Sequence, residues 1–148
     1  ARFDALSRTY EYHICRQKNV FDREFSHYIY GEMDTRNMQE AALVLKEYTD
    51  FTSFSKVDTD TKTNNCKITQ AQWYITEDSM IFTIQADRFL RNMVRAIVGT
   101  LLDLGFTRIN LDGFRQIIES RNRSLAGTSV PARGLHLTDV RYPPEIFL

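Results

Sequence analysis

Residues 87–105 read DRFLRNMVRAIVGTLLDLG, and the fold expected for the whole chain depends on this stretch. The pattern predicts one amphipathic helix, with Asp87 as its N-cap and Gly105 as the glycine that follows its last turn. Apolar residues recur there at helical spacing and form a broad arc, which consists of Leu90, Met93, Val94, Ile97, Val98, Leu101 and Leu104.

The polar side of this expected helix carries three arginines. At about 100° per residue, Arg88, Arg91 and Arg95 fall on one side, and Asn92 and Gly99 lie beside them. Like charges repel each other unless an anionic group lies opposite. A glycine inside a helix costs ~1 kcal/mol relative to alanine, so Gly99 indicates a close approach next to Arg95. The same periodicity also fits a solvated basic face on a core helix, as most polar helix faces are.

Length and composition indicate an ordinary soluble globular domain. The chain has 148 residues, of which 43% are hydrophobic and 26% are charged, enough for one domain with its own core. The formal net charge is 0, so a surface that binds nucleic acid must be a local cluster of Lys and Arg. No apolar run is long enough to span a membrane, which excludes a membrane protein of the helical class. The first residues lack an initiator Met or a leader, which suggests an excised or processed piece.

The cysteines and histidines predict neither a disulfide framework nor a metal site. Cys15 and Cys66 are isolated, and the three histidines are far apart without ligand spacing. A reducing, cytoplasmic setting is therefore the default expectation.

The order of the predicted elements indicates an α+β fold. Alternation at Tyr10, Tyr12 and Ile14 predicts a strand, and Asp34 caps a helix that continues to about Tyr48. The order β, α, β, β, α, short α, β matches the ferredoxin-like split βαβ pattern, in a single domain over residues 1–148. We expect a mostly antiparallel sheet with helices on one face. The remaining elements are a hairpin with strands around 71–75 and 80–84, a helix at 111–120 and a last strand at 135–142 that Pro143 and Pro144 end.

The connections differ in character. Residues 16–33 read as a long connection packed on the domain, and residues 50–55 (DFTSFS) as an ordered loop. Residues 56–67 are polar and predict a surface loop. Residues 121–134 hold two Gly, one Pro and three Arg ahead of the last strand.

Local motifs carry little chemistry by themselves. There is no phosphate-binding glycine loop and no nucleophile triad that spacing supports. A basic helix face, a tyrosine-rich strand and an Arg/Gly loop remain. Basic and aromatic side chains suit single-stranded or flipped nucleotides, and they equally suit an ordinary core with a solvated rim.

Four segments together resemble the C-terminal part of the bacterial tRNA pseudouridine synthase A family. In chain order they are ARFDALSRTYEY, DFTSFS, ADRFLRNMVRAIVG and AGTSVPARGLHL, and the resemblance extends from Ala1 to Pro143. It implies isomerisation of uridine to pseudouridine in the anticodon arm of tRNA, with no cofactor and no metal. It also implies a homodimeric parent protein.

The resemblance implies that a part of the active site lies outside this chain. The family's nucleophilic Asp belongs to a GRTDAG-type motif in the N-terminal half, and this sequence contains no such motif. We therefore expect a C-terminal fragment that is inactive alone and whose partners are tRNA and the missing N-terminal domain.

Residues that match the family's site are assigned one by one. Tyr10, in SRTYEY, corresponds to the tyrosine that stacks on the flipped uracil. Arg95, in NMVR, corresponds to the arginine that pairs with the catalytic Asp, and Leu135, in RGLHL, to an apolar residue of the uracil pocket. Further candidates, for contacts with RNA phosphates, are Arg8, Arg88, Arg91 and Arg133, although each one singly also fits a solvated charge.

Further expectations concern the missing half. Gly99 would be small because that half approaches the helix there. The sheet face with Tyr10 and Tyr12 would lose its cover, so the fragment would associate with itself. Cys66 occupies a position where the family often has an arginine, so an RNA contact there is in doubt.

A non-catalytic RNA-binding module of ferredoxin-like fold is the alternative, although the aromatic RNP1 sequence of RNA-recognition motifs is missing. A small-molecule regulatory domain is a third reading, which no feature of the sequence specifically supports.

Overall fold

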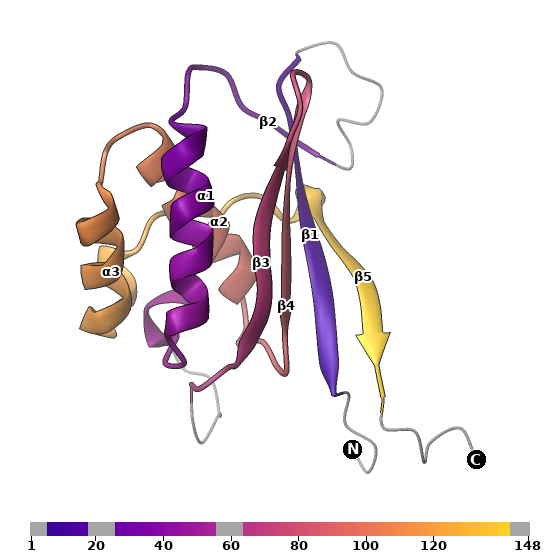
Figure 1. The fold of residues 1–148 in the computed structure, drawn as a ribbon, viewed down its shortest axis with the longest axis vertical. Helices are drawn as coiled ribbons and strands as arrows, with labels where there is room; N and C mark the ends of the chain where they lie inside the picture. The colour runs from indigo at the N-terminus through magenta and orange to yellow at the C-terminus, as the bar shows by residue number, and fades with distance from the viewer. Residues whose placement is uncertain (1–5, 18–25, 56–63, 143–148) are drawn as a thin grey trace.

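A sheet with a layer of helices on one face makes up the fold (Figure 1). The computed structural model describes residues 6–17, 26–55 and 64–142. The sheet strands are β1 (Ser7–Cys15), β3 (Ile68–Ile75), β4 (Ser79–Ala86) and β5 (Leu135–Arg141), with the two-residue β2 (His27–Tyr28) beside the end of β1. The helices are α1 (Thr35–Val44), α2 (Met93–Gly105) and α3 (Leu111–Ser120).

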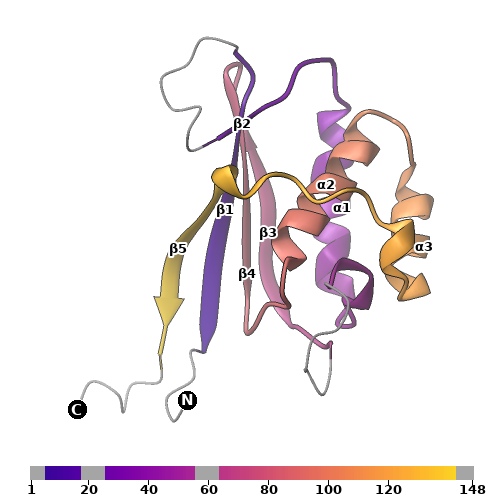
Figure 2. The ribbon, with the colours of Figure 1, turned by 180° about the vertical axis from the view of Figure 1, so that it is seen from behind.

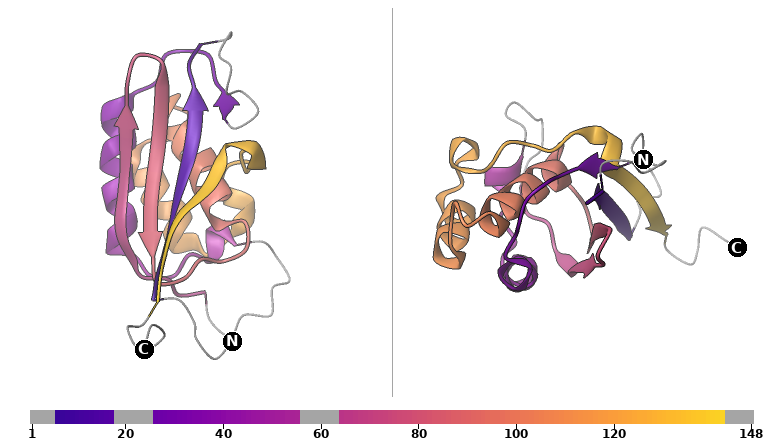
Figure 3. Two further views of the ribbon diagram at one scale, coloured as in Figure 1. Left: turned by 90° about the vertical axis from the view of Figure 1, so that its right-hand side faces the viewer. Right: turned by 90° about the horizontal axis from the view of Figure 1, so that it is seen from above.

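The sheet topology confirms the ferredoxin-like prediction. The strands lie in the order β5-β1-β4-β3, and each of these neighbouring pairs is antiparallel. Strand β4 separates β1 from β3, as the split βαβ pattern requires. The helices lie on one side of the sheet, and no described helix lies on the other face, which is turned toward the viewer in Figure 3, left. The sequence did not predict β2, which is short and pairs with β1 in parallel.

The sheet face that carries Tyr10 and Tyr12 keeps its cover, so the expectation of a lost cover is wrong. Tyr12 and Ile14 are fully buried because the helices pack against this face. Tyr10 is half-buried and packs at the margin of the core. The hairpin forms where predicted, and Ala71, Trp73 and Phe82 are buried, whereas Ile75 at the end of β3 is 38% exposed.

Helix α1 begins where the sequence predicts. The carboxylate of Asp34 accepts a hydrogen bond from the backbone N–H of Asn37 at 3.0 Å, and Met38 is fully buried on the inner face. The side chain of Gln39 donates to the carbonyl of Trp73 and accepts from its N–H. These bonds occupy backbone groups on β3 that an edge strand would leave open.

Helix α2 begins five residues later than predicted, because its N-cap position is Asn92 and not Asp87. The Asp87 carboxylate accepts from the backbone N–H of Lys67 at 2.8 Å instead. Residues 87–92 form a turn, and Asn92 adopts a left-handed conformation with φ 68°. The reason is geometric, because β4 ends at Ala86 and the chain must reverse before a helix can run back over the sheet. Leu90 is buried in this turn, which is why it fitted the helical period.

The two glycines of α2 mark close contacts within this chain. Gly105 is the last helical residue, and a Cβ there would lie 2.5 Å from Sδ of Met38 on α1. A Cβ on Gly99 would lie 1.9 Å from the carbonyl oxygen of Thr128. The close approach predicted at Gly99 is therefore present, but a loop of this chain makes it.

The remaining expectations have mixed outcomes. Helix α3 has its predicted bounds, and residues 50–55 are ordered around a 3₁₀ turn with Phe51 and Phe54 fully buried. The last strand ends at Arg141, and Pro143–Pro144 lie outside the described residues, as does most of the polar loop.

Cys66 is 1% exposed, so its side chain faces the core and offers no RNA contact. Within the described ranges, no helix is long and apolar enough to cross a membrane.

Replacing Gly99 by alanine should destabilise the protein. The added Cβ overlaps the Thr128 carbonyl, and such overpacking costs about 1–3 kcal/mol, more than the ~1 kcal/mol that alanine contributes to a helix. We expect a lower midpoint of thermal unfolding by circular dichroism. Gly113→Ala in α3 is the matched control, because no atom lies within 3 Å of its Cβ position. Equal midpoints for wild type and Gly99→Ala would contradict this packing.

Candidate functional site

Three of the predicted site residues line one small hollow beside the N-terminus of α2. Tyr10 comes from β1, Arg95 from α2 and Leu135 from β5. The hollow has a volume of about 90 Å³, and its other lining residues belong to 89–94. None of the described residues that line it is acidic. We call it the Tyr10 hollow.

Tyr10 is held from three sides. Its backbone lies between Ile84 of β4 and Leu137 of β5 in the sheet register. The ring of Phe89 meets the Tyr10 ring edge-on, with 5.0 Å between centroids and an interplanar angle of 90°. Such edge-to-face pairs are favourable for aromatic rings and fix their orientation. Sequence reasoning missed Phe89 because it lies outside the apolar arc of the helix predicted there.

Arg95 is fixed along one edge of its guanidinium. Its Nε donates to the carbonyl of Val130 at 2.8 Å, and the Val130 N–H donates to the Arg95 carbonyl at 3.2 Å. Within the described residues, the two terminal nitrogens of Arg95 have neither a hydrogen-bond acceptor nor a carboxylate partner. An arginine oriented in this way can receive an anion at its other edge.

Residues 126–134, here called the bridging loop, hold the site together. The loop passes over α2 and leads into β5 (Figure 2). The Gly127 N–H donates to Oγ1 of Thr100 at 2.9 Å, and the Asn92 amide donates to Oγ of Ser129 at 2.6 Å. The guanidinium of Arg123 donates to the Gly127 carbonyl and to Ser129, each at 3.0 Å. The loop is therefore hydrogen-bonded to α2 at its N-cap residue, Asn92, and again two turns further on, at Thr100.

Leu135 follows the bridging loop as the first residue of β5. It lies opposite Tyr12 in the register of β1 and β5 and is half-buried. It lines the Tyr10 hollow together with Tyr10 and the first turn of α2.

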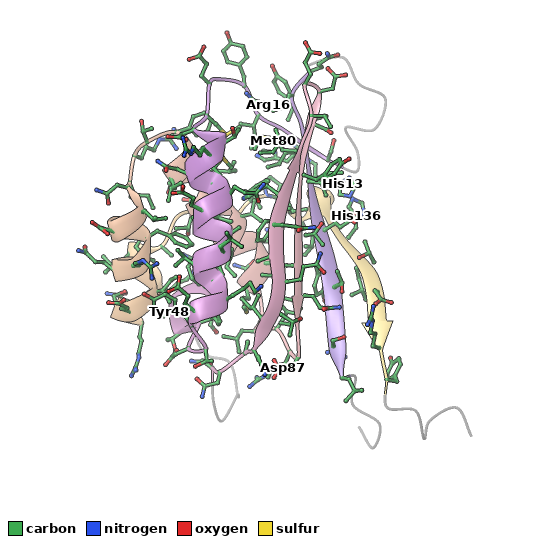
Figure 4. The ribbon with its side chains drawn as sticks, viewed as in Figure 1. His13, Arg16, Tyr48, Met80, Asp87 and His136 are labelled. Carbon is green, nitrogen blue, oxygen red and sulfur yellow. The ribbon has the colours of Figure 1, made fainter. Side chains whose placement is uncertain are left out.

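The four arginines predicted for phosphate contacts fall into two places. Arg8 pairs in register with Ala86, so it lies next to the 87–92 turn with Arg88 and Arg91. This end of the sheet carries the label Asp87 in Figure 4. The later start of α2 means that Arg88 and Arg91 do not share a helix face with Arg95.

Arg133 lies apart from the other three arginines, in the bridging loop just before β5. It is exposed and close to His27 and Tyr12. Burial lowers the pKa of His27, and the charge of Arg133 adds to that effect. His27 therefore favours its neutral form.

A larger cavity of about 350 Å³ lies on the other side of the bridging loop. It is lined by that loop, by α2 from Gly99 to Asp103 and by His27, and it contains none of the predicted site residues. The open sheet face carries mainly Gln, Thr and His side chains. His13 and His136 lie side by side there, and Glu11 accepts a hydrogen bond from His13 (Figure 4). In the described part of the chain, no group of three His, Cys, Asp or Glu could hold a metal ion.

The arrangement can bind and align a planar, polar group. The Tyr10 hollow offers an aromatic ring, a cation and apolar walls. Among the described residues, neither a carboxylate nor a thiol nor an imidazole lines it.

Comparison with known proteins identifies the family. The family model described as tRNA pseudouridine synthase matches residues 48–143. Over 147 residues the chain is 56% identical to tRNA pseudouridine synthase A of Parabacteroides distasonis, covering 99% of this chain and 58% of that protein. It is 55% identical to the Bacteroides fragilis protein of the same name, with 99% and 59% covered. It is 35% identical to the Bacillus subtilis protein of that name, with 96% and 58% covered. The chain thus spans somewhat more than half the length of these relatives, and it belongs to the tRNA pseudouridine synthase family.

Proposed function

We propose that this chain forms part of an enzyme that isomerises uridine to pseudouridine in the anticodon arm of tRNA. The observation that carries the proposal is the Tyr10 hollow. A family match over most of the chain coincides there with a tyrosine, an oriented arginine and a leucine from three different elements.

The reaction defines what the site must supply. The N1–C1′ bond of uridine breaks, a C5–C1′ bond forms, and the base loses a proton at C5 and gains one at N1. No electrons are gained or lost overall. The uracil must leave its base stack, and it must stay bound and rotate after it is detached from the ribose. The site therefore needs a flat surface that holds the base. It also needs a nucleophile or a charged group next to C1′ or the uracil ring.

The residues of the hollow fit the first of these needs. Tyr10, braced by Phe89, offers a π surface for a base that has left its stack. Leu135 packs against the base and excludes water. Arg95 would hold the catalytic aspartate through its unoccupied edge, keep that carboxylate ionised and aim it.

We propose that this aspartate comes from a segment outside the chain. At about 90 Å³ the hollow is well below the roughly 300–1,000 Å³ of sites that enclose a small ligand. Exposed apolar side chains lie along the neighbouring edge of the sheet, where Leu137 of β5 is 52% exposed and Leu6 is 56% exposed. A further domain that covers this edge would close the site. We also propose a homodimeric parent protein, as the family resemblance implies.

Arg8, Arg88 and Arg91 are the proposed contacts for tRNA phosphates. They gather at one end of the sheet, in and beside the 87–92 turn. This turn ends at Asn92, which lines the Tyr10 hollow. A cluster of this kind positions an RNA backbone, whereas the hollow receives the base. Arg133 lies apart from them and would contact a different part of the RNA.

Complementation tests the proposed activity. The chain is mixed with the segment of the Bacteroides fragilis relative that it does not match, and pseudouridine is measured in an unmodified tRNA transcript. We expect activity only from the mixture. Arg95→Ala should lower the rate at least about 100-fold, since misplacing one catalytic group costs that much. Arg95→Lys should also lose most activity, because lysine cannot bind a carboxylate bidentately.

Arg115→Ala is the control for that experiment, because Arg115 pairs with Glu47 at 3.0 Å on the helical layer and lies outside the hollow. Full activity of the Arg95→Ala mixture would reject the role of Arg95.

Salt dependence tests the phosphate contacts. Each of Arg8→Gln, Arg88→Gln and Arg91→Gln should reduce the slope of log K against log salt by about 0.7–1, because one fewer counterion is released. Fluorescence anisotropy with a labelled anticodon stem–loop measures the slope, and Arg115→Gln should leave it unchanged. Slopes that stay at the wild-type value would reject this surface. Tight, salt-dependent binding without any dependence on Tyr10 would favour a non-catalytic RNA-binding module.

A further inference from the structure

Tyr12 is the largest buried side chain next to the site, and its hydroxyl is hydrogen-bonded. It follows Tyr10 by two residues on β1, so both side chains point to the helix-covered face. Tyr12 is 0% exposed, and its hydroxyl donates to the carbonyl of Pro131 at 2.6 Å. Burial raises the pKa of the Tyr12 phenol above its ordinary value of 10.0, although the charges of Arg95 and Arg133 act in the opposite direction. The hydroxyl therefore remains a donor at physiological pH.

Pro131, whose carbonyl accepts the Tyr12 hydrogen bond, is the next residue in the chain after Val130, which holds Arg95. Pro131 follows Val130, whose backbone makes both hydrogen bonds with Arg95. Pro131 has no backbone N–H, and its ring restricts the chain at this point. The fixed φ of Pro131 therefore ties the position of its carbonyl to that of the Val130 carbonyl, which orients the guanidinium, and leaves only rotation about the Cα–C bond of Pro131 between them.

The other end of the bridging loop also rests on Tyr12. A Cβ on Gly134 would lie 2.8 Å from Cζ of the Tyr12 ring, so the backbone passes directly over the phenol. Leu135 then pairs with Tyr12 in the sheet. Tyr12 thus contacts the bridging loop at two places. One is next to Val130, which orients Arg95, and the other is Gly134, which directly precedes Leu135.

We propose that Tyr12 is a positioning residue, whose hydroxyl fixes Arg95 through Pro131 and Val130 so that the free edge of the guanidinium stays at the Tyr10 hollow. The inference rests on the proposed function for the use made of Arg95, whereas its structural part can be tested without RNA. Tyr12 touches neither substrate nor reacting atoms in this account. Its effect passes entirely through the bridging loop.

The Nε–H signal of Arg95 in a ¹⁵N-labelled sample of the chain reports its orientation. The signal is assigned by its disappearance in Arg95→Lys. In the wild type, this proton should exchange with solvent more slowly than that of the exposed Arg91, because it is hydrogen-bonded to Val130. Equal exchange rates for the two arginines would overturn the inference before any Tyr12 variant is made.

Tyr12→Phe removes only the hydroxyl and keeps the ring. We expect Arg95 Nε–H exchange to accelerate about fivefold or more, the population effect of one lost hydrogen bond. Tyr48→Phe is the matched control, because it also removes a phenol hydroxyl and keeps the ring, and that hydroxyl donates to the Glu119 carboxylate of α3 at 2.5 Å rather than to the bridging loop. It should leave Arg95 exchange unchanged.

An unchanged Arg95 signal in folded Tyr12→Phe would overturn the proposal. If that variant does not fold, Gly134→Ala tests the same link, since its Cβ would lie 2.8 Å from both Cζ of Tyr12 and the His13 carbonyl oxygen and so would push the loop from β1 while the Tyr12 hydroxyl remains. Accelerated Arg95 exchange is again the expected result, and unchanged exchange again rejects the link.

In the complementation assay, Tyr12→Phe should lower kcat and leave KM for tRNA unchanged, because the phosphate contacts are intact. A changed Arg95 signal without any pseudouridine formation by the wild-type mixture would reject the proposed function and retain the positioning role.

Discussion

The reciprocal hydrogen bonds between Arg95 and Val130 are the constraint on which the site depends. They join the first turn of α2 to the bridging loop, and that loop leads into β5. The loop can lie this close to the helix only because residue 99 has no side chain. Tyr10, Arg95 and Leu135, which are 85 and 40 residues apart in sequence, meet at one hollow as a result. The fold thus provides an oriented cation and an aromatic surface from elements that local sequence does not connect.

Much of the fold follows from sequence because its local signals agree with its packing. The Asp34 cap, the hairpin and helix α3 are present where periodicity and capping chemistry predict them. The start of α2 does not follow. Leu90 is buried and fits a helical period, but the reversal after β4 requires a left-handed Asn92, which no local pattern announces. If the helix began at Asp87, Arg88, Arg91 and Arg95 would share one helix face. Because the chain reverses first, Arg88 and Arg91 lie in the turn and only Arg95 lies on the helix.

The candidate site could likewise be predicted only in part from the sequence. Family resemblance indicated Tyr10, Arg95 and Leu135, and their grouping in one hollow needed the tertiary structure. Phe89 was missed because its contact with Tyr10 belongs to the turn. The alternation of β1 placed Tyr12 on the same sheet face as Tyr10, but it did not predict that Tyr12 is fully buried with its hydroxyl bonded to the loop that orients Arg95. Spacing along one element can show that a side chain is buried, but it cannot show which carbonyl of a distant loop that side chain meets.

Photo-cross-linking tests most directly whether an RNA base enters the Tyr10 hollow. An anticodon stem–loop with 4-thiouridine at the target position is irradiated with the complemented protein, and the modified peptide is sequenced. Our account predicts cross-links at Tyr10 or Phe89, on the helix-covered side of the sheet. A ferredoxin-like RNA-binding module would instead place bases on its open sheet face. Cross-links confined to Gln72 or Tyr74, on that open face, would contradict the account.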